Sequence, residues 1–180
     1  ATATAASARR WAPWPGRGEG AVDDLILGIG DWAVSSRPGD TLKTFALGSC
    51  VAVLIYDRVL KIAGMIHIAL PESAVDPKKA ETLPGYFADT GLPLMIEEMK
   101  KLGSVRRNVW VKLAGGATVG EAGEFFDIGR RNILMVKKIL WKSSLGPVAE
   151  DTGGTLSRTV SFAVETGEIT VTTPRGSRML

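Results

Sequence analysis

Residues 50–68 have the sequence CVAVLIYDRVLKIAGMIHI, in which two apolar segments flank a short polar one. Residues 51–56 are apolar at every position, a pattern typical of a strand that is buried on both faces. Asp57 and Arg58 open a turn, and residues 61–70 supply a strand that returns beside the first. We therefore predict an antiparallel hairpin whose first strand lies in the core.

The same segment holds the only cysteine and the only histidine of the chain, Cys50 and His67. A thiol becomes an effective nucleophile at neutral pH when a neighbouring imidazole takes its proton. If the hairpin turns between residues 58 and 59, Cys50 lies directly opposite His67. Opposed side chains on one face of a sheet have Cβ atoms about 4.5–5.5 Å apart, within reach of a thiol–imidazole hydrogen bond. This register predicts a Cys–His pair.

Both residues also have a structural interpretation that the sequence leaves open. A lone cysteine in an apolar strand is most often a small core residue. A lone histidine between two isoleucines is most often a structural group with satisfied hydrogen bonds. A register slip by one residue would turn one of the two side chains to the opposite face. Residue chemistry alone therefore allows catalysis without requiring it.

The composition is that of an ordinary globular protein of 180 residues, 45% hydrophobic and 23% charged. The 22 basic and 19 acidic residues are spread along the chain, so the net charge of +3 does not indicate a nucleic-acid partner. One cysteine and one histidine are too few for a four-ligand zinc site, and one cysteine forms no internal disulfide. No apolar run reaches the roughly 18 residues of a membrane span. We expect no metal, no cofactor and a cytoplasmic location.

One domain is predicted over residues 23–175. Residues 1–22 are rich in Ala, Thr, Pro, Gly and Arg and have no apolar period, so we expect a disordered tail rather than a secretory signal. The alternative is that Trp11 and Trp14 dock on a partner or on the domain. Residues 176–180 are assigned to a C-terminal tail.

Within the domain, strand and helix patterns alternate, which predicts a mixed α/β fold with roughly seven to nine strands and two main helices. One amphipathic helix is expected over residues 91–102, and a second from the capping residue Asp127 to about Ser144. Residues 71–85, which follow His67 closely, are expected to form a loop that acts as a lid or as a flap that contacts a partner. Further strands are predicted at residues 25–29, 42–47 and 109–113 and in a hairpin through residues 160–171.

Six strings occur in order along the chain: LGSCVAV at 47–53, GMIHIALP at 64–71, YFADTGLPLMIEEM at 86–99, KLAGGA at 112–117, IGRRN at 128–132 and AEDTGG at 149–154. Together they resemble the signature of the bacterial chemoreceptor glutamine deamidases, the CheD family. The resemblance runs from about residue 25 to residue 173. It departs from the family at Ala63, where a second glycine is common, and at Leu54, where another cysteine is frequent.

The resemblance implies hydrolysis of selected glutamine side chains on chemoreceptors to glutamate, with release of ammonia, during chemotaxis adaptation. It assigns Cys50 as the nucleophile, His67 as the base and Thr44 as the third member of the triad. The implied fold is a layered sandwich of β-sheets with two main helices packed on one side, similar to toxin-type deamidases. Gly48 and Ser49 are our candidates for the backbone segment that stabilises the oxyanion.

The implied partners are the cytoplasmic helices of chemoreceptors. Members of the family also act as methylesterases on receptors and dock a chemotaxis phosphatase, CheC, so the alternative function is a binding module that modulates such a phosphatase. A third possibility is a cysteine amidase or transglutaminase with a small-molecule substrate. The glycine pairs at 115–116 and 153–154 are expected to serve tight turns rather than substrate binding.

Overall fold

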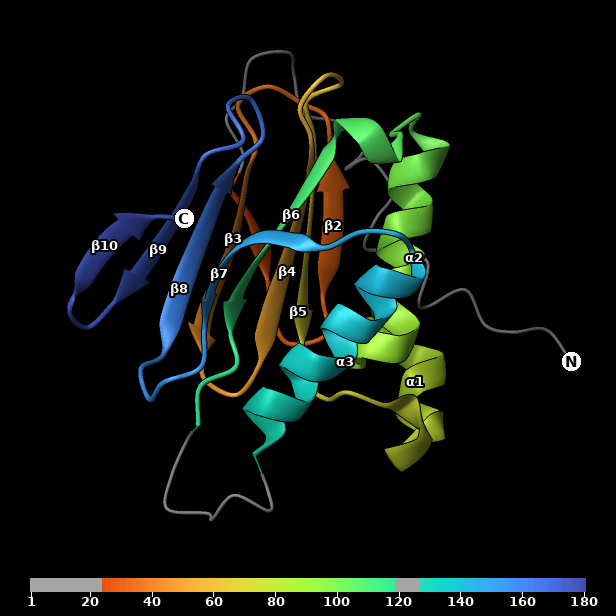
Figure 1. Cartoon of the computed structure of the whole chain (residues 1–180), viewed down its shortest axis with the longest axis vertical. Helices are drawn as coiled ribbons and strands as arrows, with labels where there is room; N and C mark the ends of the chain where they lie inside the picture. Colours follow the sequence, from red (N-terminus) through yellow and green to blue (C-terminus); the bar gives the residue numbers. More distant parts are fainter. Residues whose placement is uncertain (1–23, 119–126) are drawn as a thin grey trace, which may run out of the picture.

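The computed structural model describes residues 24–118 and 127–180. Two five-stranded sheets pack face to face, and two helices cover the outer face of one of them (Figure 1). The tail predicted for residues 1–22 lies outside the described residues. The mixed α/β fold class with two main helices is confirmed.

The first sheet has the strand order β1-β3-β8-β9-β10. Its strands are β1 (Asp24–Leu27), β3 (Thr41–Leu47), β8 (Arg158–Ala163), β9 (Ile169–Thr173) and β10 (Gly176–Met179). The pair β1–β3 is parallel and the other pairs are antiparallel. Residues 176–179, assigned to a tail from the sequence, therefore form the exposed edge strand of this sheet.

The second sheet has the order β2-β5-β4-β6-β7. Its strands are β2 (Trp32–Ser35), β5 (Ile62–Ile68), β4 (Val51–Asp57), β6 (Val109–Gly115) and β7 (Pro147–Thr152). The pair β6–β7 is parallel, and the other pairs are antiparallel. Strand β4 is thus the central strand, as its apolar sequence predicts.

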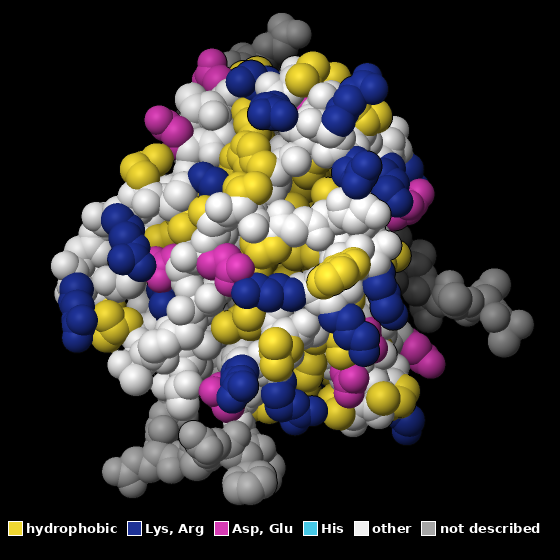
Figure 2. Space-filling view, in the orientation of Figure 1, with side chains coloured by type: hydrophobic (Ala, Val, Ile, Leu, Met, Phe, Trp, Pro, Cys, Tyr) yellow, Lys and Arg dark blue, Asp and Glu magenta, His cyan; other side chains and the backbone are white. Residues whose placement is uncertain are grey.

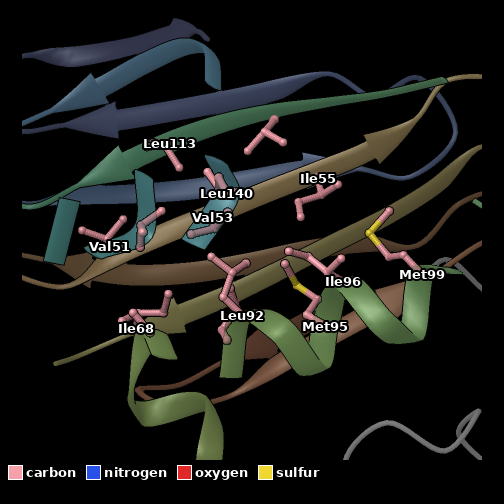
Figure 3. Close-up of a cluster of buried hydrophobic side chains, with 14 of the residues drawn as sticks. Val51, Val53, Ile55, Ile68, Leu92, Met95, Ile96, Met99, Leu113 and Leu140 are labelled. Carbon is pink, nitrogen blue, oxygen red and sulfur yellow. The ribbon is translucent and has the colours of Figure 1, made fainter. Parts of the chain in front are cut away.

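Strand β4 is buried along its whole length because each of its faces joins a different core. Val51, Val53 and Ile55 pack toward the helices, in a cluster that includes residues of β5, β6 and both helices (Figure 3). Ala52, Leu54 and Tyr56 face the first sheet and pack in a second cluster between the two sheets. A strand that contributes to two cores cannot alternate between polar and apolar residues.

The two main helices are α2 (Ala88–Lys101) and α3 (Ile128–Lys142). The cap predicted at Asp127 is confirmed, since its side chain accepts a hydrogen bond from the Arg130 N–H at 3.0 Å. Helix α2 begins three residues before the predicted Gly91. The stretch 71–85, predicted as a loop, contains a short helix, α1 (Pro77–Thr82), capped by Asp76 and flanked by 3-10 turns at Ser73–Val75 and Pro84–Tyr86.

The face of the molecule that is turned to the viewer in Figure 1 carries Lys and Arg side chains in several separate places, with Asp and Glu side chains among them (Figure 2). No cyan atom is visible on this face, in agreement with the burial of His67, which is 2% exposed. None of the helices in the described ranges is long and apolar enough to cross a membrane.

Candidate active site

The predicted site residues converge where the two sheets meet. Thr44 lies in β3 of the first sheet, and His67 lies in β5 of the second. Cys50 lies in the short segment that leads from β3 into β4. The ends of β3, β5 and β6 and the beginning of α3 lie at the same edge of the molecule, at the bottom of Figure 1.

A hydrogen bond of 2.7 Å joins the Thr44 hydroxyl to Nδ1 of His67. The same hydroxyl donates its proton to the Leu27 carbonyl oxygen at 2.8 Å. Because a hydroxyl has one proton to donate, it must accept from His67, and Nδ1 therefore carries the proton. The neutral imidazole then has its free lone pair on Nε2.

The ring of His67 is held in a buried setting. Its backbone N–H donates to the Asp31 carbonyl at 3.0 Å, and its carbonyl accepts from the Gly30 N–H at 2.8 Å. Burial lowers the pKa of the imidazole, and the Leu27 carbonyl and the Asp31 charge offset this effect only in part. Nε2 is buried and has no hydrogen-bond partner within residues 24–118 and 127–180. The imidazole is thus neutral, oriented and free to accept a proton.

Cys50 is half-buried at the end of the inter-sheet core. Burial raises the pKa of its thiol, while a hydrogen bond from its own backbone N–H acts in the opposite direction. Because Nε2 of His67 has no partner among the described residues, the predicted thiol–imidazole hydrogen bond is not formed in this structure.

The predicted pairing register is wrong by two residues. Ala52, rather than Cys50, lies opposite His67. The cause is a four-residue turn, in which the Asp57 carboxylate accepts from the backbone N–H groups of Val59 and Leu60, both at 2.9 Å. Because side chains alternate with a period of two, a shift of two keeps residue 50 on the face of residue 52. Cys50 and Ala52 accordingly pack against the same inter-sheet cluster.

All three carbonyl groups of the segment Gly48-Ser49-Cys50 are held by hydrogen bonds. The Gly48 carbonyl accepts from the Ala117 N–H at 2.8 Å, and the Cys50 carbonyl accepts from the Gly116 N–H at 2.7 Å. The Ser49 carbonyl accepts from the side-chain amide of Asn132 at 3.0 Å. In a planar trans peptide the N–H points away from the C=O. The N–H groups of Ser49 and Cys50 are therefore directed away from these partners.

The glycine pair at 115–116 permits this close packing of backbones. Both residues have positive φ, 106° at Gly115 and 65° at Gly116. A Cβ atom on Gly115 would collide with the Cys50 carbonyl oxygen, and one on Gly116 would lie 2.5 Å from the Ile133 side chain. The pair thus allows the end of β6 to approach the cysteine segment on one side and α3 on the other.

Sequence reasoning missed two residues that support this arrangement, Asn132 and Arg158. Arg158 is buried, pairs with Asp151 at 3.0 Å and donates to the Gly153 carbonyl at 2.8 Å. The 153–154 turn in turn binds β6, since the Gly153 N–H donates to the Gly115 carbonyl. Asn132 lies inside the string IGRRN, and Asp151, the partner of Arg158, lies inside AEDTGG; both strings carry the resemblance and are the signal that could have identified this support.

No cluster of three or more His, Cys, Asp or Glu side chains suited to a metal ion occurs in the part of the chain that the structure describes. The chemistry available at the site is that of a thiol, a neutral imidazole and oriented backbone N–H groups. This set suits acyl transfer through a covalent intermediate.

Comparison with known proteins points to one family. Residues 69–173 match the family model described as CheD chemotactic sensory transduction. The chain is 56% identical over 155 residues to a probable chemoreceptor glutamine deamidase CheD of Syntrophotalea carbinolica, covering 85% of this chain and 96% of that protein. It is 40% identical over 155 residues to the chemoreceptor glutamine deamidase CheD of Thermotoga maritima, covering 86% and 95%.

A protein of Syntrophus aciditrophicus named probable chemoreceptor glutamine deamidase CheD 1 is 44% identical over 155 residues, covering 86% of this chain and 97% of that protein. Among solved structures, the hypothetical protein YfiH of Bacillus licheniformis aligns with 68% of this chain and 50% of its own, at 12% identity and a TM-score of 0.44.

Proposed function

The chain belongs to the CheD family, and from this membership we propose that it hydrolyses glutamine side chains of chemoreceptors to glutamate. In this proposal Cys50 is the nucleophile, His67 is the general base and acid, and Thr44 orients the imidazole. The substrates are glutamine side chains on the cytoplasmic helices of the receptor, and the products are a glutamate side chain and ammonia.

The observation that carries the assignment is the pair of hydrogen bonds made by the Thr44 hydroxyl. Together they place the proton on Nδ1 of His67 and leave a buried lone pair on Nε2, which is the state that a general base requires. A purely structural histidine would have both ring nitrogens satisfied, whereas Nε2 has no partner in the described ranges.

The reaction begins as the Cys50 sulfur attacks the amide carbon of the substrate and Nε2 of His67 takes the thiol proton. The amide oxygen becomes an oxyanion, which the N–H groups of Ser49 and Cys50 stabilise. The C–N bond then breaks as His67 gives its proton to the departing nitrogen, releasing ammonia and leaving a thioester. His67 next activates a water molecule, which hydrolyses the thioester to the glutamate side chain and restores the thiol.

The pKa shifts of Cys50 and His67 favour a neutral thiol and a neutral imidazole in the resting protein. Burial raises the pKa of the Cys50 thiol and lowers that of the His67 imidazole, so both shifts oppose a thiolate–imidazolium ion pair. Proton transfer from sulfur to Nε2 therefore accompanies attack on the amide instead of preceding it.

Mass spectrometry of a chemoreceptor co-expressed with the wild type or with Cys50→Ala tests the proposal. The wild type should produce the mass increase that accompanies conversion of a side-chain amide to an acid at specific glutamines, and Cys50→Ala should not. Equal modification by both proteins would refute the assignment. Offering free glutamine beside receptor peptides separates a receptor enzyme from a small-molecule amidase, since ammonia should come from the peptides alone.

The same variant separates catalysis from docking of a CheC-type phosphatase, the alternative that the family resemblance suggests. If docking is an independent property, Cys50→Ala should lose ammonia release and keep phosphatase binding.

A further inference from the structure

Asn132 is a buried polar residue outside the triad that links the cysteine segment to the histidine strand. It lies in α3 and is fully buried, with 0% exposure. Its side-chain nitrogen donates to the Ser49 carbonyl at 3.0 Å and to the Ala69 carbonyl at 2.9 Å. Ser49 immediately precedes Cys50, and Ala69 follows His67 by two residues. One amide group therefore bridges the segments that carry the nucleophile and the base.

We propose that Asn132 is a positioning residue for the reaction, which acts by fixing the peptide between Ser49 and Cys50 so that the Cys50 N–H points at the oxyanion. This inference rests on the proposed function. The geometric basis is the planarity of the peptide, in which the N–H is directed opposite to the C=O. Since Asn132 holds the Ser49 carbonyl, it also sets the direction of the Cys50 N–H.

The orientation of the side-chain amide follows from its partners. Both neighbours are carbonyl oxygens, which accept hydrogen bonds and do not donate them, so the nitrogen rather than the oxygen must face them. The two N–H bonds of the amide are thereby used. The remaining atom, Oδ1, is buried without a partner in the described ranges. Burying this oxygen unpaired is unfavourable, so packing alone is a poor explanation for an asparagine here.

A neighbouring hydrogen bond has the same effect on the preceding peptide. The Ala117 N–H holds the Gly48 carbonyl at 2.8 Å, which directs the Ser49 N–H away from Ala117. The two candidate oxyanion donors are therefore each fixed through the carbonyl of their own peptide. Of these two supports, the Ala117 N–H belongs to the backbone and the Asn132 amide belongs to a side chain. Substitution can therefore remove the support from Asn132.

The test compares deamidation with alkylation of Cys50 in wild type and Asn132→Ala. Deamidation passes through an oxyanion, whereas displacement of iodide from iodoacetamide by the Cys50 sulfur does not. Loss of one oxyanion donor lowers kcat by about 100- to 1000-fold, so we expect Asn132→Ala to lower kcat about 100-fold with KM within about twofold. Alkylation should keep its wild-type rate and pH profile within about twofold.

Val136→Ala is the matched control, because Val136 is equally buried one turn further along α3. It should lower the melting temperature and leave kcat within about twofold. Asn132→Leu, which removes the donor together with the unpaired Oδ1, takes the place of Asn132→Ala if that variant lacks a cooperative unfolding transition. The same loss of kcat is expected of it.

Two results would overturn the inference: a kcat that remains at the level of Val136→Ala, or an alkylation rate that falls in proportion to kcat. Cys50→Ala distinguishes this failure from a failure of the proposed function. If Cys50→Ala still releases ammonia, the proposed function itself is wrong. If Cys50→Ala is inactive and Asn132→Ala is fully active, only the role of Asn132 is refuted.

Discussion

Thr44 and His67 belong to different sheets, yet their side chains form a 2.7 Å hydrogen bond in the interior of the protein. A second hydrogen bond of the same hydroxyl fixes its direction: β1 and β3 run parallel with Leu27 paired to Thr44, and this register brings the Leu27 carbonyl beside Thr44. With its proton given to that carbonyl, the hydroxyl can serve His67 only as an acceptor.

Replacement of Thr44 should therefore affect catalysis more than binding. Thr44→Val keeps the shape and removes the hydroxyl, so the imidazole loses the acceptor that selects its tautomer. We expect kcat to fall about 10- to 100-fold with little change in KM. Thr44→Ser, which retains the hydroxyl, should preserve most of the activity. Steady-state ammonia release measures both variants, and equal activity of Thr44→Val and wild type would contradict the role.

Stability should depend on pH through both reactive groups. The pKa of His67 is lowered in the folded protein, so below about 6.5 the unfolded chain binds a proton that the folded chain does not, and stability falls as the pH decreases toward the folded-state value. The pKa of Cys50 is raised, so stability also falls as the pH rises above about 8.5.

Urea denaturation over a pH series measures the free energy of unfolding on the acidic and alkaline limbs of this pH profile. His67→Gln should flatten the acidic limb relative to wild type, and Cys50→Ala should flatten the alkaline limb. The result against this assignment is a pair of variants whose pH dependence parallels that of the wild type.

The buried pair of Arg158 and Asp151 should be important for stability. Burial alone raises the pKa of Asp151, but hydrogen bonds from Arg178 and Arg158 outweigh it and hold the pKa below its ordinary value. The Arg158 and Asp151 side chains are 7% and 4% exposed. Arg158→Ala should lower the free energy of unfolding by about 3 kcal/mol, because it leaves a buried carboxylate with one partner.

Arg178→Ala is the control for this prediction. Its side chain is 66% exposed, so its loss should cost about 1 kcal/mol or less. Denaturant unfolding compares the two variants. If the two variants lose the same free energy of unfolding, the burial of the Arg158–Asp151 pair does not add to its contribution to stability.

Gly115 should tolerate no side chain. Its φ of 106° disfavours other residues, and a Cβ there would collide with the Cys50 carbonyl oxygen. Gly115→Ala should therefore destabilise the protein by more than about 1 kcal/mol and displace the segment that carries Cys50. Gly146→Ala, where no atom lies within 4 Å of the new Cβ, should change stability by less than about 0.5 kcal/mol. Melting curves and ammonia release for the two variants provide the comparison.

The sequence predicted the hairpin at the centre of the fold because continuous apolar runs report burial directly. It did not predict the register, since the length of the turn depends on the hydrogen bonds of Asp57 and on the positive φ of Lys61. The strands β2, β7 and β10 were missed for a similar reason. They are short or polar, and pairing with neighbours rather than their own pattern makes them strands.

The site was predictable to different degrees. Cys50 and His67 are single copies of reactive residues, which composition reveals at once. Thr44 was identified through resemblance, because nothing in a threonine within a strand marks it as a partner of histidine. Asn132 was found through tertiary structure, since the two carbonyls that it bridges are 83 and 63 residues away in the chain.

Because the candidate site draws on both sheets, it depends on strands that are synthesised far apart in time. Strand β3, which carries Thr44, is hydrogen-bonded between β1 and β8, and β8 begins only at Arg158. A nascent chain that already contains Cys50 and His67 still lacks β8, one of the two strands that hold β3 and thereby Thr44 in the first sheet. We expect such a chain to be inert toward receptors, so that hydrolytic competence arrives only after β8 (Arg158–Ala163) has been synthesised.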